Sequence, residues 1–353
     1  MSDRELLHLA IQENDTDLID MLMLDDATRK TKFNQNIPRI DLTSMTDEQV
    51  WKQFRFQRED IDRLVRLLQL PDRMIFADRT VTSGREALCV LLKRLSYPNR
   101  LVDLENVFGR CTSQLSVIVN ETVDHIYDNY SHLIHNLDQP WMDMDHLMQY
   151  SEAIVSQGAP LNKCIGFVDG TVRPISRPTF LQRTCYNGHK RTHAIKFQSV
   201  VIPNGIICSL YGPMEGKRHD CALLKESGLL QQLQQLPQDV DGRFCIYGDP
   251  AYPIRPQLQC PFRGANITPE QHAFNSEMSR VRESVEWAFG KIVQTFAFLD
   301  FKKNLKLYLQ PVGKLYAVGA ILTNCHTCCY GGVITEFFNV HPPTLEEYLY
   351  QRN

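Results

Sequence analysis

Hydrophobic positions in the first third of the chain recur with the spacing of α-helices. One amphipathic stripe stands at i, i+3, i+4 and i+7, formed by Ile61, Leu64, Val65 and Leu68. Farther along, Ser83 stands three residues before Glu86 and directly ahead of the apolar run 88–92, a capping-box pattern that marks the start of another helix. We therefore expect residues 1–135 to form a helical region.

A short turn containing Gly109 separates two of these predicted helices, which favours a helix-turn-helix at about residues 100–127. The second helix is predicted to begin near Thr112, with Thr112 as its N-cap. Its start presents short polar side chains of the kind that contact bases or phosphates: Thr112, Ser113, Gln114 and Ser116. A plain helical hairpin within a bundle explains the same pattern, and no cluster of Lys or Arg decorates the second helix.

The hydrophobic pattern changes from helical to strand-like at about residue 164. Before it, residues 136–163 read as a connector whose helix, about 144–156, stops at Gly158. After it come three strand-like segments, CIGFVDG, HAIKFQSVVIPNG and IICSLYG.

A helical stretch from Asp220, the strand FCIYGD and a helix around 279–295 follow. This order predicts an α/β domain at 164–330, with a mixed sheet flanked by helices. Residues 331–353 read as a C-terminal extension.

Composition places the chain among folded proteins and narrows its compartment. The 353 residues are 43% hydrophobic and 22% charged, enough for one large domain and a smaller helical one. No apolar run is long enough to cross a bilayer, and the N-terminus lacks the pattern of a secretory signal. Eleven scattered cysteines favour a reducing compartment, the nucleus or the cytoplasm. The net charge of -3 neither favours nor excludes nucleic acid.

Three acidic residues stand where functional groups collect in α/β domains. Asp169 and Asp249 each close a predicted strand, and strand ends commonly carry binding and catalytic groups. Glu286 falls at the border of the apolar stripe of the last predicted helix, so it can reach the sheet, whereas Glu283 points away from that stripe. Each aspartate taken alone is also typical of a turn or a helix cap.

Three carboxylates brought together repel one another unless a cation neutralises them. Oxygen ligands favour Mg²⁺ or Mn²⁺, and a pair of such ions can activate a water and stabilise the leaving oxygen of a phosphodiester. We therefore predict Asp169, Asp249 and Glu286 as catalytic metal ligands. Asp220 is either a fourth ligand or the N-cap of the helix that follows it.

A strip of positive charge lies between Asp169 and Glu215, with no acidic residue in between. Its members are Arg173, Arg177, Arg183, Lys190, Arg191 and Lys196. Such a strip beside a carboxylate cluster favours binding of a polyanion, although a solvated basic face has the same composition.

A Cys-x-x-Cys pair near the end of the predicted domain is a weaker signal. Cys325 and Cys328, followed by Cys329, are compatible with zinc, but a second ligand pair at the usual spacing is missing. We interpret them as buried thiols on an apolar helix.

Five sequence blocks follow one another between about 164 and 325, namely GFVDGT, YNGHKRTHAIKFQSVVIPNG, GPMEGKRHD, YGDPAYP and RESVEWAFGK. Together they resemble the catalytic domain of PIF/Harbinger-type transposases and their domesticated nuclease relatives. The resemblance implies a ribonuclease-H-like fold and an Asp-Asp-Glu metal triad on Asp169, Asp249 and Glu286. It also sets the family's His-Asp pair on His219 and Asp220, which favours a place for Asp220 near the metals.

The chain departs from the family pattern at two points. Pro250-Ala251 replaces the small residue and Gly that often precede Tyr-Pro, and Val172 stands where relatives often carry His after Asp-Gly-Thr. Neither change removes a ligand.

The sequence thus predicts a two-metal DNA endonuclease, with a second step that joins the freed 3′-hydroxyl to target DNA as an extension of that activity. A domesticated DNA-binding or scaffolding protein without cleavage activity and a hydrolase of small phosphates are the alternatives. DNA is the expected substrate. The resemblance further implies a Myb-like DNA-binding partner protein, and we expect a nuclear and cytoplasmic protein that assembles as a homo-oligomer.

Overall fold

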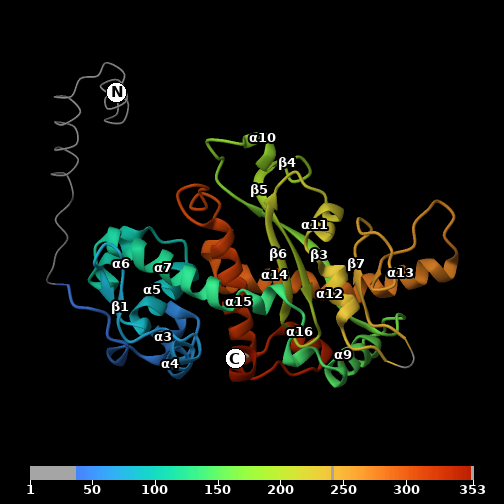
Figure 1. The fold of residues 1–353 in the computed structure, drawn as a ribbon, viewed down its shortest axis with the longest axis horizontal. Coiled ribbons are helices and arrows are strands. Elements are labelled where there is room, and N and C mark those ends of the chain that lie inside the picture. Colours follow the sequence, from blue (N-terminus) through green and yellow to red (C-terminus); the bar gives the residue numbers. More distant parts are fainter. Residues whose placement is uncertain (1–36, 240–241, 351–353) are drawn as a thin grey trace, which may run out of the picture.

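The computed structural model describes residues 37–239 and 242–350, so the part of the predicted helical region in residues 1–36 lies outside it. A helical region and an α/β body lie side by side, with one long helix, α15 (Val312–Tyr330), between them (Figure 1). No helix in the described ranges is long and apolar enough to cross a membrane.

The helical region contains the predicted helices and one short hairpin. Its elements are η1 (Leu42–Ser44), α3 (Asp47–Phe54), α4 (Arg58–Leu67), β1 (Met74–Ile75), β2 (Val81–Thr82), α5 (Gly84–Ser96), α6 (Leu101–Phe108), α7 (Thr112–Tyr130) and α8 (His132–His135). The antiparallel pair β1–β2 corrects the expectation that this region is entirely helical. Ser83 caps α5 by accepting from the amide of Glu86, but the carboxylate of Glu86 accepts from Arg110 and Thr82 and does not complete the capping box.

Helices α6 and α7 are joined at Gly109, which takes the left-handed conformation that ends α6 (φ 59°). The N-cap of α7 is Cys111 and not Thr112, whose hydroxyl donates to Glu105 of α6 (2.6 Å). Most of α7 packs against its neighbours in the core, and its exposed side chains are Ser113, Glu121, Asp128 and Asn129. The helix pair has the predicted connection, but the solvent face of α7 carries acids and no Lys or Arg.

The α/β body is built on a mixed sheet. Its strands are β3 (Cys164–Pro174), β4 (Tyr186–Asn187), β5 (Thr192–Val201), β6 (Ile207–Glu215), β7 (Cys245–Gly248) and β8 (Leu258–Gln259). β3, β5 and β6 pair antiparallel, while β7 and β8 extend the sheet in parallel on the other side of β3. Residues 194–201 of β5 are all buried, as expected for a central strand covered on both faces. The predicted α/β class with a mixed sheet is confirmed.

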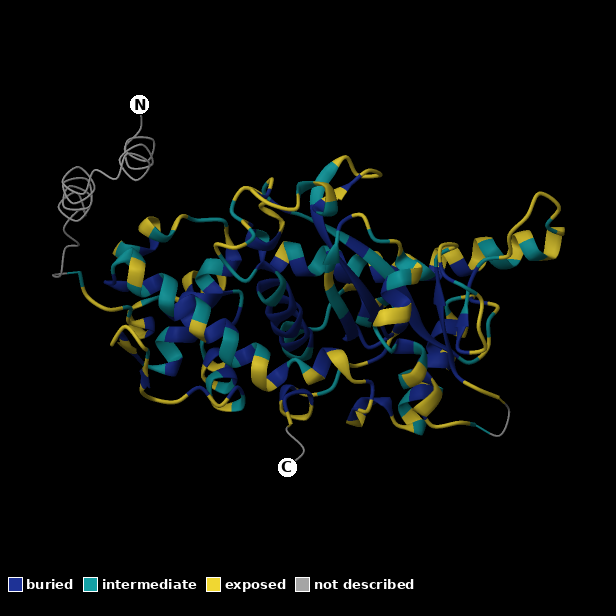
Figure 2. Cartoon of the chain, turned by 45° about the horizontal axis from the view of Figure 1, so that its top comes forward, coloured by how far each residue is buried: buried dark blue, intermediate teal, exposed yellow. Residues whose placement is uncertain are grey.

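Helices flank this sheet and continue past it. They are η2 (Pro140–Met142), α9 (Met144–Ser156), α10 (Gln182–Cys185), α11 (Asp220–Glu226), α12 (Leu229–Gln235), α13 (Pro269–Arg282), α14 (Ser284–Thr295), η3 (Ala297–Asp300), α16 (Val333–Phe338) and α17 (Leu345–Tyr348). Two segments predicted as single helices are divided. The helix predicted from Asp220 breaks at Gly228. The helix predicted around 279–295 begins earlier, at Pro269, and is interrupted at Glu283. Helix α13 lies on an arm with many exposed residues (Figure 2).

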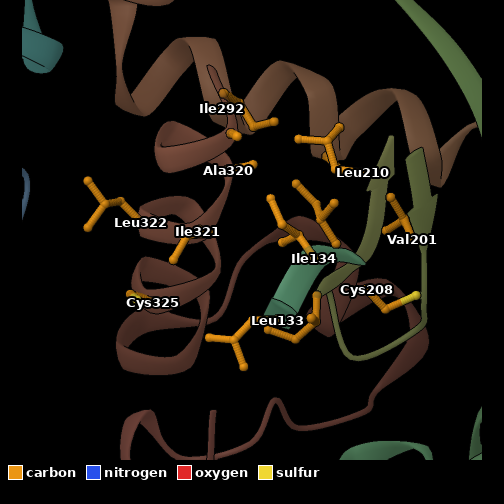
Figure 3. Close-up of a cluster of buried hydrophobic side chains, with 14 of the residues drawn as sticks. Leu133, Ile134, Val201, Cys208, Leu210, Ile292, Ala320, Ile321, Leu322 and Cys325 are labelled. Atoms are coloured by element: carbon orange, nitrogen blue, oxygen red, sulfur yellow. The ribbon is translucent and has the colours of Figure 1, made fainter. Parts of the chain in front are cut away.

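The core around α15 joins the two regions. Side chains of α8, β5, β6, α14 and α15 meet in one apolar cluster (Figure 3). On another side of α15, Lys314 pairs with Asp124 and Asp128 of α7. The segment predicted as a C-terminal extension also packs here, because the buried Tyr348 accepts a hydrogen bond from Asn324 of α15 (2.9 Å).

Candidate active site

Two of the predicted acids lie next to each other because of how β3 and β7 pair. These strands are parallel, with Val168 opposite Gly248, so Asp169 and Asp249 each follow a paired residue on adjacent strands. The prediction that Asp169 closes its strand is wrong in one respect. β3 continues to Pro174 through its pairing with β5, and only its pairing with β7 ends at Val168.

Asp220 lies over the residue that follows Asp169. A Cβ atom at Gly170 would come within 2.6 Å of Asp220 Oδ1, so this position requires the absence of a side chain. Asp220 is not the N-cap of α11, since that position belongs to His219. Its carboxylate instead accepts from Lys196 Nζ (2.6 Å). Asp220 therefore lies near Asp169 and Asp249, and we call these three residues the acid cluster.

A buried tyrosine, Tyr252, packs against Gly248, the residue directly before Asp249. Its side chain is fully buried, and its hydroxyl accepts from Gln198 Nε2 (3.2 Å). Burial raises the pKa of Tyr252 well above its ordinary value, and the negative charges of Asp220, Asp169 and Asp249 raise it further. Sequence reasoning missed this residue, although an aromatic three positions after a strand-end acid is a signal that the loop folds back over the strand.

The pKa values of Asp169 and Asp249 are both raised. Burial raises the pKa of Asp169, and the nearby charge of Asp249 adds to the effect, while Arg282 opposes it. Burial likewise raises the pKa of Asp249, to which the charge of Asp220 contributes. A cluster with this electrostatic character favours a proton or an additional cation.

Glu286 stands apart from the aspartates and is linked to them through Arg282. Arg282 donates from Nη1 to Asp169 Oδ2 (3.1 Å), and its Nη2 lies 3.9 Å from Glu286 Oε1. The side chain of Glu286 is 61% exposed, contrary to the expected position beside the buried face. The interruption at Glu283 places Glu286 in the first turn of a new helix, and Glu283 is exposed as predicted.

The contacts of these side chains bear on whether they can hold a divalent cation. Within the described residues, no group of three or more His, Cys, Asp or Glu side chains is arranged to hold a metal ion. The donor chemistry nevertheless fits a hard divalent cation, because burial and a neighbouring carboxylate both raise the pKa of Asp169 and of Asp249. Two internal cations supply the positive charge instead, Arg282 at Asp169 and Lys196 at Asp220. Arg282 is the side chain that has to move for Asp169 and Glu286 to share an ion.

Two members of the predicted basic strip are turned into the protein. The Lys196 side chain is only 8% exposed and bonds to Asp220. Arg173 donates to Thr171 Oγ1 (2.6 Å) and lies over the ring of Tyr316. The remaining four are exposed, namely Arg177, Arg183, Lys190 and Arg191.

The cysteines of the Cys-x-x-Cys pair lie on α15. Cys325 is buried, whereas Cys328 and Cys329 are partly covered. Burial raises the pKa of all three thiols, that of Cys329 to about 12. This environment agrees with their interpretation as thiols of a helix packed in the core.

The comparisons with known proteins bear on this site. Residues 168–324 match the family model described as DDE superfamily endonuclease. The matched segment contains Asp169, Asp220, Asp249 and Glu286. The match supports a metal-dependent nuclease or transposase-derived function, and the mixed sheet flanked by helices is consistent with a ribonuclease-H-like endonuclease domain. No significant match was found among curated proteins or among solved structures.

Proposed function

We propose that this protein is a metal-dependent DNA endonuclease of the PIF/Harbinger type that hydrolyses phosphodiester bonds at the acid cluster. The observation that carries the proposal is that Asp169 and Asp249 follow paired residues of adjacent strands, with Asp220 next to Gly170, inside the segment that matches the DDE endonuclease family model. Partial burial and a neighbouring negative charge raise the pKa of Asp169 and of Asp249, and a divalent cation would stabilise both carboxylates in their ionised form.

Asp169, Asp249 and Glu286 are the proposed catalytic ligands of Mg²⁺ or Mn²⁺. When bound, a pair of such ions activates water and stabilises the leaving oxygen of a phosphodiester. Lys196 neutralises Asp220 and fixes its carboxylate beside Gly170, which leaves Asp220 as an additional ligand or as a group that orients the others. Arg282 pairs with Asp169 in the metal-free protein, and this pair would have to break for Asp169 and Glu286 to bind the same ion.

DNA is the proposed substrate. Exposed guanidinium and ammonium groups at Arg177, Arg183, Lys190 and Arg191 are available for phosphates. Contacts from Thr112, Ser113 and Gln114 at the start of α7 are a second, weaker element of the proposal, since Thr112 is bonded to Glu105 and the exposed face of α7 is acidic.

The test is cleavage of supercoiled plasmid and of terminal-repeat DNA in Mg²⁺ or Mn²⁺. Asp249→Ala and Glu286→Ala are expected to lose activity by about 100-fold or more, because each removes a ligand carboxylate. Glu283→Ala is the matched control, an exposed acid near the same helix start, and should cut as the wild type does. Equal activity in all four proteins would refute the proposal.

The ion pair between Arg282 and Asp169 favours one alternative, a DNA-binding or scaffolding protein that no longer cuts. In that case Arg282 is a permanent structural partner of Asp169. Calorimetric titration discriminates the two functions, because the non-cleaving protein binds DNA tightly and takes up no Mn²⁺.

We further propose strand transfer by the freed 3′-hydroxyl, a Myb-like partner protein that assists DNA targeting and nuclear entry, and a homo-oligomeric assembly in the nucleus and cytoplasm. Localising the protein alone and together with such a partner tests the partner requirement. Nuclear accumulation that does not depend on the partner would contradict it.

A further inference from the structure

Two surface segments far apart in sequence form one patch beyond the end of β3. They are residues 174–183, which lead from β3 into α10, and residues 301–310, which precede α15. The Ser176 hydroxyl donates to the carbonyls of Lys302 and Lys303 (2.9 and 3.1 Å), and its amide donates to that of Leu305 (2.9 Å). Figure 1 shows the loop before α15 beside the chain that leads to α10. These contacts hold the two segments together as one surface, which we call the aromatic–basic patch.

Large apolar side chains project into solvent on this patch. Phe180 is 68% exposed and Tyr308 is 65% exposed, although their rings contact each other edge to face with centroids 6.2 Å apart. Leu181 and Leu309 next to them are also largely exposed. A soluble protein rarely leaves a group of large apolar side chains uncovered unless the group binds something.

The backbone holds two of these residues in an uncommon conformation. Leu181 and Tyr308 both lie in the left-handed region, with φ of 56° and 69°. Bulky residues seldom adopt this region, and such positions persist where the surroundings impose them, often at functional sites. The backbone conformation at Leu181 and Tyr308 therefore fixes the direction of the chain at the exposed side chains of both segments.

Positive charge surrounds the apolar side chains. The exposed cations of the two segments are Arg177, Arg183, Lys302, Lys303 and Lys306. Neither segment contains an acidic residue, and none of these five cations forms an ion pair within the described part of the chain. Asp300, directly before the second segment, lies 3.8 Å from Arg173.

This combination of chemistry fits nucleic acid better than protein. Exposed rings stack on unpaired bases, and unpaired Lys and Arg side chains contact the phosphates between those bases. Protein interfaces favour aromatics but are depleted of Lys, which supplies three of the five cations here. Stacking requires a base whose face is accessible, so the rings discriminate single strands from intact duplex.

The first segment of the patch begins on the same strand as Asp169. Pro174, its first residue, stands five residues after Asp169 on β3, or about 16 Å along the strand at the usual rise per residue. That length corresponds to about five steps of a stacked DNA strand. We propose that the aromatic–basic patch binds unpaired nucleotides of a DNA strand that extends from the cutting site. This proposal rests on the proposed function and names the form of DNA that the protein prefers.

The test is binding of DNA by the full chain without divalent metal, measured by fluorescence anisotropy. One probe is a blunt duplex, and the other is the same duplex with a short single-stranded tail. The wild type should bind the tailed probe more tightly than the blunt probe. Phe180→Ala/Tyr308→Ala should lose about tenfold in affinity for the tailed probe for each base that no longer stacks, with little change for the blunt probe.

Three further variants make the result specific. Phe180→Leu/Tyr308→Leu keeps the surface apolar but removes stacking, so it should behave as the alanine pair does. Lys303→Gln/Lys306→Gln should weaken both probes and reduce the salt dependence of binding. Tyr97→Ala removes a tyrosine with 61% exposure in the helical region and should change neither probe.

Equal wild-type affinity for the two probes, with no effect of the alanine pair, would overturn the proposal. Selective capture of an acidic peptide without any preference for tailed DNA would reassign the patch to a protein partner and also overturn it. Failure of the proposed function is distinguished by the plasmid assay. A protein that prefers tailed DNA but does not cut refutes the proposed nuclease function and supports the role of the aromatic–basic patch. A protein that cuts DNA but shows no preference for the tailed probe supports the nuclease function and refutes the role of the patch.

Discussion

At the sheet edge, the positions of Asp169, Asp249 and Asp220 follow from strand pairing and from the close approach of Asp220 to Gly170. At the junction of α13 and α14, the side chain of Glu286 is 61% exposed and is linked to Asp169 through Arg282. The first region is positioned by the fold, whereas the second depends on one side chain and on a helix interruption. On the proposed function, binding of a metal ion would require rearrangement at the junction and little at the sheet.

The largest expected effect tests the rigidity of the sheet side. Tyr252→Ala should lower the free energy of unfolding by about 4 kcal/mol, because a fully buried aromatic ring is replaced by a cavity. Tyr252→Phe removes only the hydroxyl that accepts from Gln198 and should cost about 1 kcal/mol. Urea denaturation measures both. If Tyr252→Ala lowered the free energy of unfolding by less than Tyr252→Phe does, the ring of Tyr252 would not be packed in the core at the strand end.

The second prediction concerns the competition between Arg282 and a metal ion. Arg282→Gln should strengthen Mn²⁺ binding about tenfold in calorimetric titration, because Asp169 loses the cation that opposes metal entry. Arg280→Gln is the matched control two residues earlier on α13, where Arg280 bonds to the carbonyl of Gln157. Weaker Mn²⁺ binding in Arg282→Gln would assign Arg282 to positioning the ligands and contradict the competition.

The third prediction uses the raised pKa of Asp249. Asp249→Asn should raise the free energy of unfolding at neutral pH by about 1 kcal/mol, the scale of a single stabilising substitution. Burial and the charge of Asp220 raise the folded-state pKa, so the wild type is most stabilised below the ordinary value of 3.8 and loses that contribution as pH rises through the raised pKa. The asparagine still accepts from the amide of Ala251.

Denaturation of wild type and Asp249→Asn at a series of pH values measures this difference. It should be largest near neutral pH and shrink as the pH falls toward 3.8. Asp72→Asn, at an exposed position, serves as the control. A gain in stability that does not change with pH would contradict an origin in the ionised carboxylate.

The smallest effect on stability is expected on the junction side. Glu286→Gln should change the free energy of unfolding by less than about 0.5 kcal/mol, because its side chain is 61% exposed. The same variant should nevertheless lose plasmid cleavage. Retained cleavage would exclude Glu286 as a catalytic residue. A large loss of stability would show that its carboxylate already stabilises the metal-free protein.

The four longer strands of the sheet could be predicted because each contains a run of apolar residues, and in β3 and β7 an Asp-Gly or a Gly-Asp step marks the end of that run. Asp169 and Asp249 therefore stood out from their position alone. The role of Asp220 could not be predicted, because its link to Lys196 joins residues 24 positions apart and the residue also begins a helix. Local sequence is compatible with both a cap and a cluster acid.

Exposure of single charged side chains was predicted less well. Lys196 reads as a surface cation when charges are counted along the chain, yet β5 is covered on both faces and its lysine is buried. For Glu286, the apolar stripe predicts a position beside the buried face of one continuous helix, whereas the helix is interrupted at Glu283 and Glu286 falls in the first turn of α14. Both errors arise from tertiary packing.

The bond between Asn324 and Tyr348 has a practical consequence for expressing the nuclease segment alone. The matched residues 168–324 end at Asn324, whose side chain also holds the backbone of Ile207 on β6. A fragment cut at that boundary would leave this amide without its tyrosine and would divide α15 in its middle. Autonomous folding therefore requires the chain to continue through α17, well beyond the limit that sequence similarity suggests.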